Sequence, residues 1–387
     1  MIAAFDGCVA RSGREGEEIL QFEQRWAEKL GVRNAVATSS ATGGLHLLLA
    51  AHGVGPGDEV IVPAHTFAAS GHAILHAGAT PVVVDIELET LCLSPGAAEQ
   101  AIGPRTKAMM IVHIGGKPAR MDALLALADA HGLLVIEDAA QAHGTTYDGR
   151  YAGTFGDGGV FSFSPKLMTA LRGGVIVCDD DDVAERCRRL RFHGLSSSRG
   201  RAHEQRQLHG NNTHFVHHEP GWNMVMTSLQ AAILLPQLEQ LDHRFERRHA
   251  NGSALARNLA EIPGLTPVMG VPEGRSNFYM LELLYDPTAF GGLGRDELVT
   301  ALTWEGVPVS PTALARMLIF ENPSMASCPR WPCPIAEEVN ETGLVLGHPL
   351  QSSALDGDAA MIAKIFDCFT RVHANAAELV RHFSTSS

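Results

Sequence analysis

Two side chains suited to covalent chemistry each stand at the end of a short apolar run. Lys166 closes the run Gly-Val-Phe-Ser-Phe-Ser-Pro-Lys and is one of five lysines among thirty basic residues. Asp138 closes the run Leu-Leu-Val-Ile-Glu-Asp, 28 residues earlier. An amine and a carboxylate delivered at buried strand ends are the two groups that pyridoxal phosphate chemistry requires. The amine bonds to the aldehyde carbon, and the carboxylate keeps the ring nitrogen protonated.

Both residues also have a simpler interpretation. Asp138 could cap a helix that follows it, whereas a ribose-binding role would need an earlier Gly-x-Gly-x-x-Gly, which the sequence lacks. Lys166 could be a structural lysine whose stem covers apolar surface while its charge reaches water. However, Phe161 and Phe163 precede it and Gly173-Gly174 follow it. These neighbours favour a desolvated amine, whose pKa is lowered and which is nucleophilic near neutral pH.

The other four lysines are weaker candidates for a nucleophile. Lys29 and Lys364 lie in amphipathic segments with helical periodicity, where we expect them to be solvated. Lys107 precedes a predicted strand and is therefore at the wrong end for a ligand, because ligands bind at the carboxyl ends of strands. Lys117 lies in a loop after a strand and remains a competitor of Lys166.

A phosphate site and a stacking ring are suggested by two further segments. Ser39-Ser40-Ala41-Thr42-Gly43-Gly44 follows the first predicted strand and precedes a helix, so its backbone N–H groups and hydroxyls could converge on a phosphate. The same residues would also make a good helix N-cap with no ligand. Phe67 follows Pro63-Ala64-His65-Thr66 and is either a core aromatic, the default, or a ring stacked on a planar cofactor.

The elements that must position these residues follow a regular pattern. From residue 34 to about 180, short apolar runs alternate with helical patterns, as in successive β-α units. The predicted strands are residues 34–38, 59–62, 80–85, 108–113, 133–137, 160–163 and 175–178, and the helices include 43–51, 67–76 and 121–131. This alternation predicts an α/β fold with a mostly parallel sheet covered by helices on both faces.

The C-terminal third has a different pattern. Residues 227–249 predict one long amphipathic helix, within which Pro236 could introduce a kink or a break. A strand at 278–285, a helix at 295–305 and a closing helix at 355–374 follow, and residues 382–387 are predicted to be frayed. A chain of 387 residues suggests two domains. We expect a large domain at 1–245 and a smaller α+β domain at 246–387.

Composition excludes several classes of function. An apolar content of 45% with 19% charged residues is ordinary for a soluble protein. The net charge of −13 argues against nucleic acid or an acidic membrane surface as a partner. No run approaches 20 apolar residues, and the start Met-Ile-Ala-Ala-Phe-Asp-Gly lacks a basic region followed by an apolar core, so a cytoplasmic protein is expected.

Metal binding is not expected either. The seven cysteines have no zinc-site spacing. Five of the nineteen histidines fall within residues 196–220, and a surface loop is the preferred interpretation of that stretch over a metal site. They are His203, His209, His214, His217 and His218.

The order of these segments resembles that of the DegT/DnrJ/EryC1/StrS sugar aminotransferases, which are fold-type-I pyridoxal phosphate enzymes. The resemblance covers nearly the whole chain and is carried by residues 21–30, 35–47, 58–78, 112–122, 137–144, 160–174 and 221–231. It implies a large domain with a mostly parallel seven-stranded sheet and a smaller C-terminal α+β domain. It also implies pyridoxal 5′-phosphate as the cofactor.

The resemblance implies a role for each residue around the cofactor ring. Asp138 would pair with the ring nitrogen and Gln141 would approach the 3′-oxygen. Phe67 would stack on the ring. Lys166 would hold the cofactor covalently and then move the proton between the amino donor and the cofactor.

A second group of residues is implied at the phosphate. Ala41 and Thr42 would offer backbone amides, and Ser162 or Ser164 would add a hydroxyl. Asn223, in Gly221-Trp222-Asn223, resembles an asparagine that reaches the phosphate from the partner subunit. A homodimer with shared active sites is therefore expected.

The implied activity is transfer of an amino group from glutamate or glutamine to a keto-sugar or keto-cyclitol, in secondary-metabolite (such as antibiotic) or surface-sugar biosynthesis. Two alternatives stay open. Residues 166–170 and His348 are similar to 3-amino-5-hydroxybenzoate synthases, which aminate, dehydrate and aromatise a ring. The run before Lys166 is one residue shorter than the family's Ser-Phe-x-x-x-Lys, which would suit a non-catalytic relative.

Overall fold

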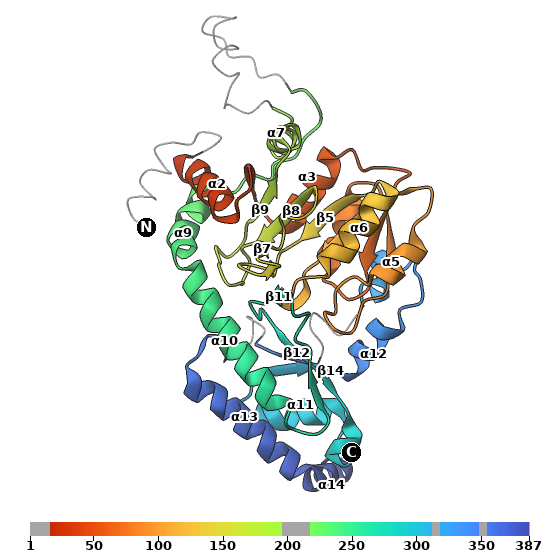
Figure 1. The fold of residues 1–387 in the computed structure, drawn as a ribbon, viewed down its shortest axis with the longest axis vertical. Coiled ribbons are helices and arrows are strands. Elements are labelled where there is room, and N and C mark those ends of the chain that lie inside the picture. Colours follow the sequence, from red (N-terminus) through yellow and green to blue (C-terminus); the bar gives the residue numbers. More distant parts are fainter. Residues whose placement is uncertain (1–15, 196–216, 312–317, 348–353, 387) are drawn as a thin grey trace, which may run out of the picture.

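The computed structural model describes residues 16–195, 217–311, 318–347 and 354–386. The upper part of Figure 1 contains a twisted sheet with helices around it, and the lower part contains a second, smaller sheet. Helix α10 connects the two parts. Among the helices within these ranges, none combines the length and the apolar character that crossing a bilayer demands.

The larger sheet has seven strands in the order β1-β9-β8-β5-β4-β2-β3. The five strands from β8 to β3 are parallel, and β9 runs antiparallel to both of its neighbours. Their bounds are β1 Asn34–Thr38, β2 Glu59–Pro63, β3 Thr80–Val84, β4 Thr106–Val112, β5 Leu134–Asp138, β8 Gly158–Ser162 and β9 Gly174–Cys178. The seven predicted strands and the mostly parallel sheet are thus confirmed, with ends that shift by two residues at most.

The sheet is buried on both faces because its apolar side chains alternate between two cores. Val36 of β1 packs in one core with helices α3 and α7, whereas Ala35 and Ala37 pack in another with α2 and α9. The core that contains Val36 is the large core, and it also includes apolar residues of α4, α5 and α6. The helix bounds are α2 Glu17–Leu30, α3 Ala41–Ala51, α4 Ala68–His76, α5 Pro95–Ala101, α6 Met121–His131, α7 Asp181–Leu190 and α9 Ser228–Glu239.

An aromatic cluster fixes the end of β8. The rings of Phe161 and Phe163 pack edge-on against Trp26 of α2, with centroids 5.2 and 5.4 Å away. Phe163 also meets the Phe22 ring at 5.4 Å. Buried aromatic pairs of this geometry contribute about 0.5–1.5 kcal/mol each beyond the area that they bury. The segment that carries Lys166 therefore leaves the sheet from a firmly held point.

The smaller part is built on an antiparallel sheet with strand order β10-β12-β14-β13. These strands are β10 Leu265–Pro267, β12 Leu281–Tyr285, β14 Gly343–Leu346 and β13 Val309–Pro311. The helices are α10 Leu241–Leu259, α11 Arg295–Trp304, α12 Pro334–Thr342, α13 Ala359–Ala374 and α14 Ala376–Ser386. The α+β character expected of this part is confirmed.

Short elements complete the fold. Strands β6 Thr146–Tyr147, β7 Arg150–Tyr151 and β11 Gly274–Arg275 form a three-stranded sheet that joins the two parts. The 3-10 turns are η1 Ile114–Gly116, η2 Pro287–Phe290, η3 Ile319–Glu321, η4 Pro323–Met325 and η6 Ala354–Asp356.

The single helix predicted for residues 227–249 is wrong. Two helices, α9 and α10, occupy this region, and the second continues to Leu259. Helix α9 runs through Pro236, and the chain turns at Gln240, whose N–H bonds to the Gln237 carbonyl three residues earlier. A proline removes only one intrahelical hydrogen bond, so packing on both sides can keep the helix intact through it.

The frayed tail predicted for residues 382–387 is also wrong as far as the structure describes it. Residues up to Ser386 belong to α14. The Phe383 ring stacks on Trp304 of α11, with centroids 5.5 Å apart. A terminal segment stays ordered when an apolar face docks it onto the body of the protein. Packing of this kind with a distant helix is invisible in the local sequence.

The boundary predicted between residues 245 and 246 remains a prediction. Helix α10 is continuous across it. In the C-terminal part, residues 329–331 pair with β3, the end strand of the large sheet. The Val83 N–H donates to the Pro329 carbonyl, and the Trp331 N–H donates to the Val83 carbonyl. Apolar side chains from residues 318–339 also pack in the core of the large sheet, namely Leu318, Ile319, Met325, Cys333, Ala336 and Val339. The C-terminal part therefore returns to the large sheet after leaving it.

Candidate active site

The two residues that opened the sequence argument lie at one edge of the large sheet. Asp138 is the last residue of β5, and Lys166 follows the end of the adjacent parallel strand β8 at Ser162. In the register of this pair Asp138 is opposite Val160. Since the carboxyl ends of parallel strands meet at one edge, the fold delivers both groups to the place where ligands bind in such sheets.

Asp138 is held in a fixed orientation by neutral donors. Its side chain is 6% exposed. The Ser70 hydroxyl of α4 donates to Oδ2 at 2.7 Å and the Ala140 N–H donates to Oδ1 at 3.1 Å. Burial raises the pKa of this carboxyl, and the hydrogen bonds oppose that shift. Turns rather than a helix follow Asp138, so its interpretation as a helix N-cap is wrong.

The Lys166 amine points toward a tyrosine from the other part of the molecule. Its Nζ donates to the Tyr279 hydroxyl at 2.7 Å and lies 4.4 Å from the centroid of the same ring. Burial lowers the pKa of Lys166 to about 8, and the negative charge of Asp138 opposes this shift. The lowered pKa gives Lys166 the neutral amine that a nucleophile needs.

We expect this lowered pKa to appear as a pH dependence. The rate at which the apoprotein forms a covalent adduct with pyridoxal phosphate should rise with pH and level off above about 8. For a solvated lysine the rise would continue past about 10. Stopped-flow absorbance would measure the rate, and borohydride trapping with peptide mapping would assign the adduct to residue 166. A rate that continues to climb above pH 9 would contradict the buried environment of this amine.

The start of α3 lies next to the end of β8. Ser40 caps α3 through its side chain, which accepts from the Gly43 N–H at 3.0 Å, so Ala41 and Thr42 form the first turn of the helix. Gly174 pairs with Ser162 on one side and with Thr38 on the other. A Cβ at Gly174 would lie 2.6 Å from the Ala41 nitrogen, so only glycine allows this approach. Gly174 thus lets the start of α3 pack closely against the sheet, beside the strand end that carries Ser162.

The remaining hydroxyl candidate, Ser164, lies just beyond this point. Its N–H donates weakly to the Ser162 hydroxyl at 3.4 Å. Ser162 itself is buried and Ser164 is half-buried. Both serines therefore remain predicted phosphate contacts.

Phe67 is not a core residue. It stands immediately before α4 and is 54% exposed. Three residues later, the same helix supplies the Ser70 hydroxyl that holds Asp138. The default interpretation of Phe67 as a core aromatic is therefore wrong, and its stacking on a cofactor stays a prediction.

Gln141 and Asn223 occupy different surroundings. The Gln141 side-chain oxygen accepts from the Gly115 N–H at 2.7 Å, which fixes its amide in the loop after β5. Asn223 is exposed and lies on a segment that runs beside the end of β1, where the Ser39 N–H donates to the Met224 carbonyl. Asn223 therefore lies on the surface of the described chain, and its contact with a partner's phosphate stays a prediction.

Lys117, the competitor of Lys166, is engaged elsewhere. Its side chain is fully buried, and its amine lies 2.5 Å from the Glu282 carboxylate of β12. Removing one partner of a buried ion pair leaves the other charge uncompensated, so the Lys117–Glu282 pair holds the lysine amine in place. Lys117 joins the two parts of the molecule, and its engagement with Glu282 favours Lys166 as the candidate nucleophile.

Two residues of the site were missed at the sequence level. Ser70 lies within a predicted helix, and Tyr279 lies in the segment 278–285 that was predicted to be a strand. Ser70 is separated from Asp138 by 68 residues and Tyr279 from Lys166 by 113. No local pattern signals such pairings. The histidines and arginines between 196 and 216, and His348, lie outside the described residues.

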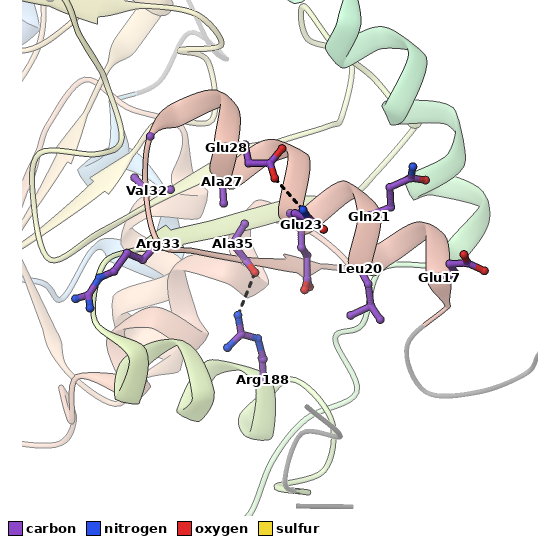
Figure 2. Close-up of a pocket in the computed structure, with 12 residues that line it drawn as sticks. Glu17, Leu20, Gln21, Glu23, Ala27, Glu28, Val32, Arg33, Ala35 and Arg188 are labelled. Carbon is purple, nitrogen blue, oxygen red and sulfur yellow. Dashed lines mark hydrogen bonds between the residues drawn. The ribbon is translucent and has the colours of Figure 1, made fainter. Parts of the chain in front are cut away.

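A separate hollow of about 770 Å³ lies between α2, β1 and α7 (Figure 2). Some of its polar lining groups form hydrogen bonds within the protein. Arg188 donates to the Ala35 carbonyl, and Glu23 accepts from the Ala37 N–H and from Arg191. Such groups stabilise the docking of α2 on the sheet. Neither Lys166 nor Asp138 lines this hollow, so the chemistry lies elsewhere.

Comparisons with known proteins agree with this geometry. A sequence model of the DegT/DnrJ/EryC1/StrS aminotransferase family matches residues 8–360. The chain is 40% identical to the spore coat polysaccharide biosynthesis protein SpsC of Bacillus subtilis (strain 168), over 74% of this chain and 73% of that protein. It is 39% identical to a protein of Streptomyces kanamyceticus assigned as an L-glutamine:3-amino-2,3-dideoxy-scyllo-inosose aminotransferase, over 76% and 68% of the two chains.

A solved structure extends the similarity to the whole fold. The crystal structure of a 3-amino-5-hydroxybenzoic acid synthase superposes with a TM-score of 0.83 at 28% identity and covers 98% of this chain and 97% of that one. The match of the family model over most of the length shows more than a shared fold. The chain therefore belongs to the DegT/DnrJ/EryC1/StrS aminotransferase family and is an aminotransferase.

Proposed function

We propose that this aminotransferase uses pyridoxal 5′-phosphate to move an amino group from glutamate or glutamine to a ketone of a sugar or cyclitol. The observation that carries the proposal is the pairing of Lys166, whose pKa is lowered to about 8, with the buried carboxylate of Asp138 at adjoining strand ends. The relatives supply the class of acceptor, since one acts in polysaccharide biosynthesis and one is assigned to a cyclitol.

The residues at this edge of the sheet fit the cofactor. Asp138 would face the ring nitrogen with both of its oxygens already oriented by Ser70 and Ala140. Phe67 offers an exposed ring for stacking. The phosphate would lie at the N-terminus of α3, where the backbone donors and the dipole favour an anion. Lys166 would provide the covalent attachment.

The chain's own groups would then control the proton and the geometry. When bound, the cofactor supplies an electron sink that stabilises negative charge beside the donor nitrogen. The Lys166 amine would move the proton at Cα of the amino donor, because its pKa near 8 suits proton transfer at neutral pH. Asp138 would keep the ring nitrogen protonated, and its hydrogen bonds would prevent it from turning away.

We propose further that a homodimer completes the site. Three side chains on the segments that would form it are exposed, namely Phe67, Leu171 and Asn223. Leu171 is 80% exposed and lies in the loop that carries Lys166. Apolar side chains that are exposed beside a polar site favour coverage by another protein surface. Asn223 would reach the phosphate of the partner's site, as in the family that the chain resembles.

The proposal is tested by following the nitrogen. Glutamine labelled with ¹⁵N at the α-amino or the amide position, and labelled glutamate, would each be incubated with panels of keto-sugars and keto-cyclitols. We expect the α-amino label to appear in an aminated product, detected by mass spectrometry. Absence of label from every product, together with absence of a reducible adduct at Lys166, would overturn the proposal. The donor and acceptor that react would name the substrates.

One alternative has an observation in its favour. The whole-chain similarity to 3-amino-5-hydroxybenzoic acid synthase supports an enzyme that aminates and then dehydrates a ring. The same incubations separate the two functions. Loss of water with an aromatic ultraviolet spectrum would establish the synthase, whereas a product that keeps its ring hydroxyls would exclude it. A non-catalytic relative would bind the cofactor and transfer no label.

A further inference from the structure

Within the described part of the chain, the Lys166 amine donates its side-chain hydrogen bond to Tyr279, with 2.7 Å between Nζ and the phenol oxygen. The amine also lies over the phenol ring, 4.4 Å from its centroid. The phenol hydroxyl has an acceptor of its own in the Pro165 carbonyl, at 3.4 Å. Tyr279 is 4% exposed and lies just before β12, in the smaller part of the molecule.

The backbone is bent to present this ring. Phe278 has a φ of +45°, a left-handed conformation that an aromatic residue rarely adopts. The buried Arg248 guanidinium holds it there by donating to the carbonyls of Phe278 at 2.7 Å and Tyr279 at 3.3 Å. Arg248 is itself paired with Asp356 at 2.7 Å. Strain that the surroundings enforce is typical of residues with a functional task.

The same segment is tied to the loop after β5. The Asn277 amide donates to the carbonyls of Gln141 at 2.8 Å and His143 at 3.0 Å, and its oxygen accepts from the Tyr279 N–H at 2.7 Å. The Met280 N–H donates to the Gly115 carbonyl. The phenol is therefore fixed relative to both Asp138 and Lys166, although it comes from the other part of the chain.

We propose that Tyr279 is a positioning residue for Lys166, holding the amine in line with the reacting carbon whenever the amine is not covalently bound. The inference deepens the proposed function and rests on it. A phenol suits this task because it can accept from an ammonium and donate to a neutral amine. Burial raises the pKa of Tyr279, so the phenol keeps its proton over the working range of pH.

Removing the hydroxyl should affect the two forms of Lys166 unequally. The bond from a charged ammonium is about twice as strong as one between neutral groups. Tyr279→Phe therefore removes more stabilisation from the charged amine than from the neutral one. The pKa of Lys166 should fall by about one unit, and the freed amine should reach the reacting carbon less often.

The test compares Tyr279→Phe with Tyr285→Phe. The control also loses a buried hydroxyl, which donates to the Leu293 carbonyl at 2.7 Å, but it lies at the end of β12, in the core of the smaller part. The first readout is the pH dependence of pyridoxal phosphate uptake by each apoprotein. For Tyr279→Phe we expect the midpoint to shift down by about one pH unit. For the control we expect no shift.

The second readout is the split between kcat and KM. Tyr279→Phe should lower kcat about tenfold to hundredfold and leave the KM of the amino donor within about threefold, because orientation rather than binding is lost. Tyr279→His should recover most of kcat, since a ring nitrogen can take over the hydrogen bond. It also serves as the test variant if Tyr279→Phe does not fold.

The outcomes are distinct. An unchanged uptake midpoint and kcat in Tyr279→Phe, with wild-type protein that binds the cofactor normally, would overturn the role of Tyr279 alone. Equal losses in Tyr279→Phe and Tyr285→Phe would also overturn it, because they would indicate a general structural effect. Failure of the wild-type apoprotein to take up pyridoxal phosphate at Lys166 would instead overturn the proposed function.

Discussion

Lys166→Ala is expected to abolish turnover, with kcat reduced by about 10⁴-fold or more, since in the proposed function this one residue provides both the covalent attachment and the proton transfer. The borohydride-reducible adduct should disappear from the peptide that contains residue 166. Pyridoxal phosphate could still bind non-covalently, because Asp138, Phe67 and the start of α3 are unchanged. Absorbance of the cofactor and mass mapping of the reduced protein would measure both effects.

Lys364→Ala is the matched control for this variant. Lys364 is an exposed residue of α13, so its removal changes the charge by the same amount without touching the site. Its activity should equal that of the wild type. If Lys166→Ala kept a reducible adduct on another lysine together with measurable turnover, Lys166 would not be the nucleophile. Lys117 would then be re-examined despite its ion pair with Glu282.

Asp138→Asn is expected to lower kcat by about 10²–10³-fold while the protein stays folded. The amide has the shape of the carboxylate: its oxygen can still accept from the Ala140 N–H, and its NH2 group can donate to the Ser70 hydroxyl. It carries no charge, however, to keep a ring nitrogen protonated. The loss should therefore appear in the chemical step rather than in stability. Single-turnover kinetics and thermal unfolding would separate the two effects.

Ser70→Ala provides a graded comparison. It removes one hydrogen bond from Asp138 and leaves the negative charge in place. We expect its effect on kcat to be about tenfold, intermediate between wild type and Asp138→Asn. A hydrogen bond to a charged group contributes about 1.5–3 kcal/mol, which would appear here as poorer orientation. Wild-type kcat in Asp138→Asn would show that this carboxylate does not act on the cofactor.

The strands of the sheet were predicted accurately because buried strands and helices show regular patterns of apolar residues in the sequence. Residues 34–38 and 121–131 were predicted as elements with the bounds that the structure has. The apolar runs that end at Asp138 and near Lys166 belong to neighbouring strands, so the two groups that opened the argument do reach one edge of the sheet. The resemblance to the aminotransferase family, carried by these same segments, is confirmed.

The local sequence failed where a distant partner decides the outcome. Phe67 is a large apolar residue of a type usually found in the core, yet it is exposed. It lies directly before α4, at the edge of the sheet. The tail at 382–387 is polar enough to fray, yet Phe383 docks it onto Trp304. In both places the side chain's own neighbours in sequence are uninformative.

The sequence by itself determined the strands, the family and the two groups at the strand ends, since each depends on residues close together along the chain. Only the tertiary structure decided which side chains hold those groups. Ser70 meets Asp138, and Tyr279 meets Lys166, across separations of 68 and 113 residues. Such contacts depend on how the β-α units wind and where the smaller part returns to the sheet. The spacing of apolar residues, with a period of two in a strand or 3.6 in a helix, indicates which face of an element is buried. It does not indicate which residues cover that face.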